Sequence, residues 1–212
     1  MDFCFYLITG QYAAGGRSIE DVLAQAIEGG VKGVLLREKD LPEKELLALA
    51  ERARDLTRRN GVRLLISGRV DIAQAVGADG VHLGGSSLPV KAAREMVGDE
   101  RYVAVSTHSL AEAIEAEEGG ADFVTFGPVY YTPSKAGYGP PVGVEALEVV
   151  CRRLTIPVFA LGGIGPDNVV EVMKAGAYGV AVISSVIGAT DPAEAARNII
   201  ARIKDYKLGR VI

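Results

Sequence analysis

Two short segments rich in glycine and serine could bind a phosphate group through their backbone. The segment Leu161–Asp167 (LGGIGPD) follows one apolar run, and Ile183–Ser185 follows the next. Glycine lets an oxyanion approach backbone N–H groups, and the start of a following helix adds partial positive charge. The alternative is that the glycines only form a tight turn. The residues predicted to bind phosphate are Gly162, Gly163, Ile183 and Ser184.

Two cations follow an earlier apolar run. Arg37 and Lys39 flank Glu38, and residues two apart on an extended chain point to the same side. Two cations on one side suit a phosphate or a carboxylate. The alternative is an ordinary solvated charge run.

The segment Gly127–Gly143 is too long for a simple turn between a strand and a helix. Loops of this length usually form a lid or a binding loop, although a flexible surface loop is the alternative. Thr132, Ser134 and Lys135 could hold a phosphate, and Tyr130 is one of three tyrosines in this loop.

The chain has two histidines. His108, in Ser106–Ser109 (STHS), follows an apolar run and could transfer a proton or orient a ligand. His82 lies inside an apolar run and is expected to be structural. No cluster has metal-ligand spacing, and Asp71 is expected to cap a helix.

Elements that would position these residues alternate along the whole chain. Eight short apolar runs are expected to be strands, and the clearest helix between them is predicted over Pro42–Asn60. The predicted strands are Cys4–Thr9, Gly33–Arg37, Arg63–Ser67, Gly80–Leu83, Tyr102–Ser106, Phe123–Phe126, Pro157–Leu161 and Gly179–Ile183.

A short repeat precedes several of these runs. Gly77–Val81 (GADGV), Gly120–Val124 (GADFV) and Gly176–Val180 (GAYGV) each join a helix end to a strand start. Eight strand–helix units over about 200 residues predict a single-domain (β/α)₈ TIM barrel spanning residues 1–212. A doubly wound open sheet is the rival, but the segment after the first run, Thr9–Tyr12, is not a dinucleotide-binding fingerprint.

Composition excludes several classes of protein. The chain is 49% hydrophobic with a formal net charge of −4, so no basic field recruits nucleic acid or a membrane. Cys4 and Cys151 are too few for a disulfide scaffold. We expect a cytoplasmic protein, since no signal peptide or membrane-length stretch is visible. The sequence does not decide the oligomeric state and is compatible with a homo-oligomer.

Six segments resemble the thiamine phosphate synthase / TenI superfamily, in order and over nearly the whole chain. The resemblance implies a TIM barrel that acts on a small phosphorylated thiazole ligand. The segments are Leu35–Lys39 (LLREK), Ser67–Ala73 (SGRVDIA), Val76–Gly84 (VGADGVHLG), Ser106–Ser109 (STHS), Phe126–Lys135 (FGPVYYTPSK) and Leu161–Ile164 (LGGI).

The superfamily has two main branches. The synthase couples a pyrimidine pyrophosphate to thiazole phosphate and expels Mg²⁺-bound pyrophosphate. The TenI-type tautomerase shifts a proton in a carboxylated thiazole phosphate without a metal. The resemblance assigns substrate binding to Arg37, Lys39, Ser106, Thr132 and Ser134.

Four positions depart from the synthase or tautomerase pattern. Leu35 replaces a Gln, while Gly68 and Ser87 replace the two Mg²⁺-binding aspartates of the synthase. Pro128 stands where the tautomerase has its general-acid His. The first three departures favour a metal-independent, TenI-type tautomerase without a cofactor, and the segment 68–73 (GRVDIA) resembles the tautomerase pattern, whereas Pro128 matches the synthase. Thiamine phosphate synthase, with Mg²⁺, is the alternative, and a non-catalytic phosphate-binding regulator is the second. The candidate catalytic residues are His108, Lys135 and Tyr130.

Overall fold

The computed structural model of the protein describes residues 1–133 and 139–209. Eight parallel strands pair in sequence order, and β1 also pairs with β8, so the sheet closes into a barrel. The (β/α)₈ TIM-barrel prediction is therefore confirmed, and each predicted strand end lies within one residue of the observed end. The strands are β1 (Phe5–Ile8), β2 (Gly33–Leu36), β3 (Arg63–Ser67), β4 (Gly80–Leu83), β5 (Tyr102–Thr107), β6 (Phe123–Phe126), β7 (Val158–Leu161) and β8 (Gly179–Val182).

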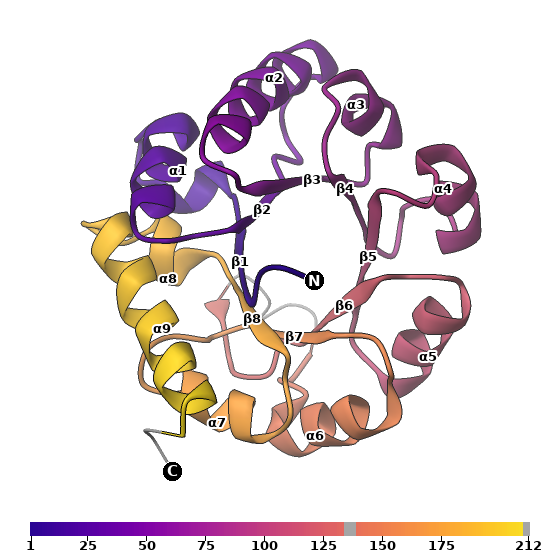
Figure 1. The fold of residues 1–212 in the computed structure, drawn as a ribbon, viewed down its shortest axis with the longest axis vertical. Coiled ribbons are helices and arrows are strands. Elements are labelled where there is room, and N and C mark those ends of the chain that lie inside the picture. Colours follow the sequence, from indigo (N-terminus) through magenta and orange to yellow (C-terminus); the bar gives the residue numbers. More distant parts are fainter. Residues whose placement is uncertain (134–138, 210–212) are drawn as a thin grey trace.

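Helices surround the barrel in a ring, which Figure 1 shows end-on. The 3₁₀ helix η1 (Gln11–Ala13) precedes the first of them, and no helix of the described residues is long and apolar enough to cross a membrane. The α-helices are α1 (Ile19–Glu28), α2 (Glu43–Arg59), α3 (Val70–Ala75), α4 (Val90–Val97), α5 (Leu110–Glu118), α6 (Gly143–Arg153), α7 (Val169–Lys174), α8 (Ser184–Ile187) and α9 (Pro192–Lys207).

The core has two parts. One lies between the strands and the helices, and the other fills the barrel itself with large side chains such as Tyr6, Phe123 and Phe159. Phe3 joins this inner cluster and packs edge-on against Phe123, with ring centroids 5.9 Å apart. The N-terminal end of the chain accordingly crosses the middle of the ring in Figure 1. Side chains thus fill the barrel, and a ligand must bind at one of its ends.

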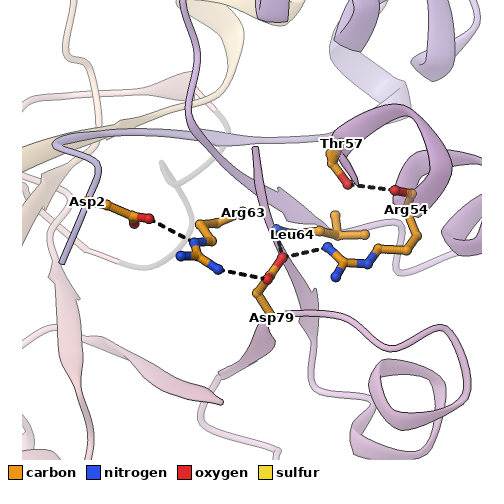
Figure 2. A network of polar contacts seen from close by, with 6 residues as sticks. All are labelled: Asp2, Arg54, Thr57, Arg63, Leu64 and Asp79. Atoms are coloured by element: carbon orange, nitrogen blue, oxygen red, sulfur yellow. Dashed lines mark hydrogen bonds and ion pairs between the residues drawn. The ribbon is translucent and has the colours of Figure 1, made fainter. Parts of the chain in front are cut away.

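The repeated Gly-Ala-Asp segment has a structural role at the N-terminal ends of the strands. The Asp79 carboxylate accepts hydrogen bonds from the Leu64 backbone N–H (2.9 Å) and from Arg54 (2.7 Å), and Arg63 pairs with it at 3.2 Å. Arg63 also donates to Asp2 (2.9 Å), so the network ties the N-terminal segment to β3 and α2 (Figure 2).

The second copy of the repeat makes the same kind of contact. Asp122 accepts from the Val103 backbone N–H (2.6 Å) and from Arg94 on α4 (2.5 Å). In both copies a carboxylate before one strand caps the start of the preceding strand and holds the helix that leads into that preceding strand. Residues of this kind at the N-terminal face of a TIM barrel serve stability.

We expect Asp79→Ala to lower the free energy of unfolding by about 2–3 kcal/mol, because it leaves the largely buried Arg54 and the Leu64 N–H without their acceptor. Urea unfolding followed by circular dichroism measures this change. An unchanged unfolding midpoint would contradict the role given to Asp79.

Asp71 provides the matched control. The expectation that its side chain caps a helix is wrong: Asp71 lies in the first turn of α3 and forms an ion pair with Arg69 (2.6 Å), and the cap position makes no side-chain hydrogen bond. Its side chain is 63% exposed, against 14% for Asp79. Because solvent screens such a pair, we expect Asp71→Ala to lower stability by less than about 1 kcal/mol.

Candidate active site

A cavity of about 590 Å³ opens at the C-terminal ends of β6, β7 and β8. This volume is in the range of small-molecule sites, and this end of a TIM barrel carries the active site in known enzymes. The four residues predicted to bind phosphate all line it: Gly162, Gly163, Ile183 and Ser184.

The two glycines of the β7 loop are required by the backbone around them. Both have positive φ, at +101° for Gly162 and +65° for Gly163. A Cβ at Gly162 would lie 2.5 Å from the Cα of Pro128, and one at Gly163 would lie 2.8 Å from the carbonyl oxygen of Tyr131. The two glycines therefore form a tight turn, and the same turn forms the cavity wall that we expect to receive a phosphate.

Ser185 is a polar group of this cavity that the sequence analysis did not single out. It lines the cavity beside Ser184, and its hydroxyl is buried without a hydrogen-bond partner among the described residues. A buried hydroxyl left unpaired is costly. The Ser-Ser pair was visible in the sequence, but only the fold shows which of its two hydroxyls is buried.

His108 is held by the β6 loop and by α5, the helix that follows this residue, and lines the cavity. Its Nδ1 lies within hydrogen-bond distance of the Gly127 carbonyl oxygen, and its backbone N–H donates to Glu112 (2.8 Å). A carbonyl oxygen can only accept, so Nδ1 carries the proton. In the neutral ring Nε2 then keeps a lone pair, which gives His108 a group that can accept or return a proton.

Tyr130 has a different environment from that expected of a proton donor. Its hydroxyl donates to Glu171 on α7 (2.6 Å), and the ring is not among the residues that line the cavity. Burial first, and then the hydrogen bond to Glu171, raise the pKa of Tyr130. The geometry favours a tether between the β6 loop and α7. Thr132 of the same loop lines the cavity, while the predicted Ser134 and Lys135 lie outside the described residues.

Arg37, Lys39 and Ser106 do not line the cavity. Ser106 pairs with Nε2 of the buried His82 (2.9 Å), as suits a structural histidine. Burial first, and then the positive charge of Arg37, lower the pKa of His82 to about 3. Arg37, directly after β2, is half-buried, whereas Lys39 is exposed.

Gly68 and Ser87 lie side by side at the ends of β3 and β4. A Cβ on Gly68 would lie 3.3 Å from the hydroxyl of Ser87. The two positions at which the resemblance expects aspartates are therefore neighbours. Magnesium needs hard oxygen ligands, usually carboxylates. Neither residue supplies one, and no group of three His, Cys, Asp or Glu in the described part of the chain could hold a metal. The residues present do not fit a Mg²⁺ site.

Tyr12 is a cavity residue that the sequence analysis missed. It lies in η1, after β1, and its side chain lines the cavity beside the β8 loop. The buried carboxylate of Glu38 holds this turn, since Oε2 accepts from the backbone N–H of Gln11 (2.8 Å). The sequence signal was a lone aromatic residue in a Gly-rich segment after a strand.

The fold and the site define the class of protein: a (β/α)₈ barrel with a ligand-sized cavity at the C-terminal ends of its strands. Residues 5–186 match the family described as "Thiamine monophosphate synthase". The chain therefore belongs to the thiamine phosphate synthase / TenI family, a family of thiamine biosynthesis, which implies phosphorylated thiamine precursors as ligands.

Individual relatives cover nearly the whole chain. A putative thiamine-phosphate synthase of Geobacter sulfurreducens is 54% identical over 95% of this chain and 94% of that protein. The thiamine-phosphate synthase of Moorella thermoacetica is 42% identical over 92% of each. The solved structure of a thiamine phosphate pyrophosphorylase from Pyrococcus furiosus has a TM-score of 0.86, with 35% identity over 95% of each chain. These names support the synthase alternative better than the TenI-type branch favoured from sequence.

Proposed function

We propose that the protein binds thiazole phosphate in the cavity at the ends of β6–β8 and joins it to a pyrimidine pyrophosphate, forming thiamine phosphate. The observation that carries this proposal is the position of the cavity: its wall contains the Gly162–Gly163 turn and the Ser184–Ser185 pair, where barrels of this type commonly bind phosphate. The names of the full-length relatives support the transfer reaction.

In this reaction the thiazole nitrogen attacks the methylene carbon of the pyrimidine, and the bond from that carbon to pyrophosphate breaks. The cavity wall orients the thiazole by its phosphate, so the ring nitrogen is held in position for the attack. Arg37 and Lys39 are the cations that we assign to the departing pyrophosphate. They must act without the carboxylate-bound metal that Gly68 and Ser87 cannot hold.

A second reaction has its own support. Gly68 and Ser87 remove the metal site that the transfer reaction would use, and His108 presents a proton-transfer group to the same cavity. Both features suit tautomerisation of a carboxylated thiazole phosphate, which needs a proton moved and no pyrophosphate expelled.

Direct assay of the two reactions separates these proposals. The purified protein is incubated with thiazole phosphate plus pyrimidine pyrophosphate, or with the carboxylated thiazole phosphate tautomer, each with and without Mg²⁺. We expect thiamine phosphate to form, slowly, in the first mixture. Turnover in the second mixture alone would contradict the synthase proposal and support the tautomerase. Ligand binding without turnover in either mixture would support a non-catalytic regulator.

A further inference from the structure

Two exposed tyrosines flank the same cavity. Tyr12 is 62% exposed and Tyr131 is 68% exposed, and both line the cavity. They are the two aromatic residues among the strongly exposed large apolar side chains of the described part of the chain. The other such side chains there are aliphatic or methionine and lie outside this cavity: Met1, Leu88, Met96, Val149 and Leu208.

The two rings come from loops far apart in sequence. Tyr12 lies in η1 after β1, and Tyr131 lies in the loop after β6. Within the described residues, no other aromatic ring packs against either one, and the two do not contact each other as rings. Two exposed aromatic side chains thus line one ligand-sized cavity, and no other aromatic ring of the described residues covers them.

We propose that Tyr12 and Tyr131 form an aromatic clamp that holds a flat heteroaromatic ring, while the phosphate of the same ligand binds at the Gly162–Gly163 turn. This inference rests on the proposed function for the phosphate position and adds the element that selects the ring. Flat rings stack on tyrosine faces, whereas sugar phosphates and acyclic phosphates present no such surface.

The backbone fixes one side of the clamp to the predicted phosphate loop. Tyr130 donates its backbone N–H to the Gly162 carbonyl (3.1 Å), and the Tyr131 carbonyl lies 2.8 Å from the point where a Cβ on Gly163 would stand. The hydroxyl of Tyr130 anchors the same segment to Glu171 (2.6 Å). Tyr131 therefore follows directly from a segment packed on the β7 turn.

The other side of the clamp is also held. The ring of Tyr12 folds back over Gly10, since a Cβ on Gly10 would lie 2.6 Å from its Cε1 atom. The backbone N–H of Gln11 donates to Glu38, a carboxylate only 8% exposed, which joins η1 to the end of β2. These contacts therefore fix the backbone that carries each ring before a ligand arrives, which reduces the ordering entropy lost on binding.

The test compares a ligand that has a ring with one that has none. Calorimetric titration of the full chain with thiazole phosphate and with inorganic phosphate is carried out on wild type, Tyr12→Ala, Tyr131→Ala and the double Ala variant. Tyr12→Phe and Tyr131→Phe are the matched controls, because they keep the ring and lose only the hydroxyl. Both residues are exposed, so the variants are expected to fold, and circular dichroism verifies this.

We expect each Ala substitution to weaken thiazole phosphate binding about five- to tenfold and the double variant about ten- to a hundredfold, as for the loss of base–aromatic stacking. Inorganic phosphate should bind within about twofold of wild type in all variants, and the Phe variants should bind both ligands like wild type. The clamp would be overturned if the Ala variants lost affinity for both ligands equally. It would also be overturned if the double Ala variant bound thiazole phosphate with wild-type affinity.

A parallel titration with a pyrimidine phosphate and with ribose 5-phosphate separates failure of the clamp from failure of the proposed function. If wild type binds the pyrimidine phosphate but not thiazole phosphate, the proposed substrate is wrong. The clamp is then supported if the Ala variants lose affinity for the pyrimidine phosphate and keep their affinity for ribose 5-phosphate. It is overturned if they do not. If wild type binds no ring-bearing phosphate, both inferences are overturned.

Discussion

Introducing two aspartates together, Gly68→Asp and Ser87→Asp, is expected to raise Mg²⁺-dependent formation of thiamine phosphate about a hundredfold or more. The positions are adjacent, with 3.3 Å between the Ser87 hydroxyl and a Cβ on Gly68, so two carboxylates there can share one cation. A bound metal stabilises the charge of a departing pyrophosphate by several kcal/mol, and a hundredfold gain needs about 2.7 kcal/mol.

The local backbone can accept these changes. Gly68 has φ of +68°, a conformation that most residues avoid and that Asp and Asn tolerate best. The Ser87 hydroxyl accepts from the Gly84 N–H (2.9 Å), and an aspartate can accept that bond as well. Each single substitution is expected to do little, since one carboxylate rarely holds Mg²⁺ against its hydration.

The double variant Gly68→Asn with Ser87→Asn is the matched control, because asparagine has the same size and backbone tolerance without the charge. Thiamine phosphate is measured across a Mg²⁺ series for wild type, both single variants and both double variants. Rapid, Mg²⁺-dependent turnover in wild type would contradict the absence of a metal site. Equal rates in the Asp and Asn double variants would show that these positions do not bind the metal.

The barrel could be predicted from sequence because its signals are local and repeated. Parallel strands covered on both sides are continuously apolar, so runs such as Arg63–Ser67 and Phe123–Phe126 have sharp ends. Because consecutive strands pair in the barrel, the Gly162–Gly163 turn and Ser184 follow neighbouring strands. In the structure these residues line one cavity.

The environment of individual side chains could not be predicted in this way. Tyr130 was a candidate for catalysis, but its partner Glu171 lies on a later helix, and only the fold brings them together. The sequence analysis considered Glu38 only as the residue between two cations, whereas its carboxylate is buried and holds the turn that carries Tyr12. Contacts between residues distant in sequence decide these roles.

The neighbouring positions of Gly68 and Ser87 show a third limit. Gly68 and Ser87 are 19 positions apart in the sequence, and only the pairing of β3 with β4 makes them neighbours. The resemblance identified what was missing from each position. The structure adds that the two losses affect one place, which is why the two substitutions are expected to act together and not singly.

His108→Asn is expected to reduce tautomerisation of the carboxylated thiazole phosphate at least about a hundredfold, the order typical of a lost acid–base group. The Gly127 carbonyl fixes the proton on Nδ1, so Nε2 is the proton acceptor that the variant removes from this cavity-lining residue. Pro128, at the position of the family's general acid, has no titratable atom and cannot replace it.

The same substitution should leave two other properties almost intact. Affinity for thiazole phosphate is expected to stay within about threefold, because the phosphate is assigned to the β7 and β8 loops. Thiamine phosphate formation should also persist, since the thiazole nitrogen attacks through a lone pair and needs no proton removed from the ring. Steady-state rates for both reactions and a binding titration, measured on one preparation, test all three expectations.

His108→Asn keeps the loop contact, because its amide nitrogen stands where Nδ1 stands in histidine and can still donate to the Gly127 carbonyl. His108→Ala, which removes both the contact and the titratable group, is the matched variant: if loop position alone matters, His108→Asn should keep turnover while His108→Ala does not. Near-wild-type tautomerisation in both variants would remove His108 from the mechanism and leave Lys135 as the candidate. Loss of thiamine phosphate formation along with tautomerisation would instead show that the histidine positions the thiazole for both reactions.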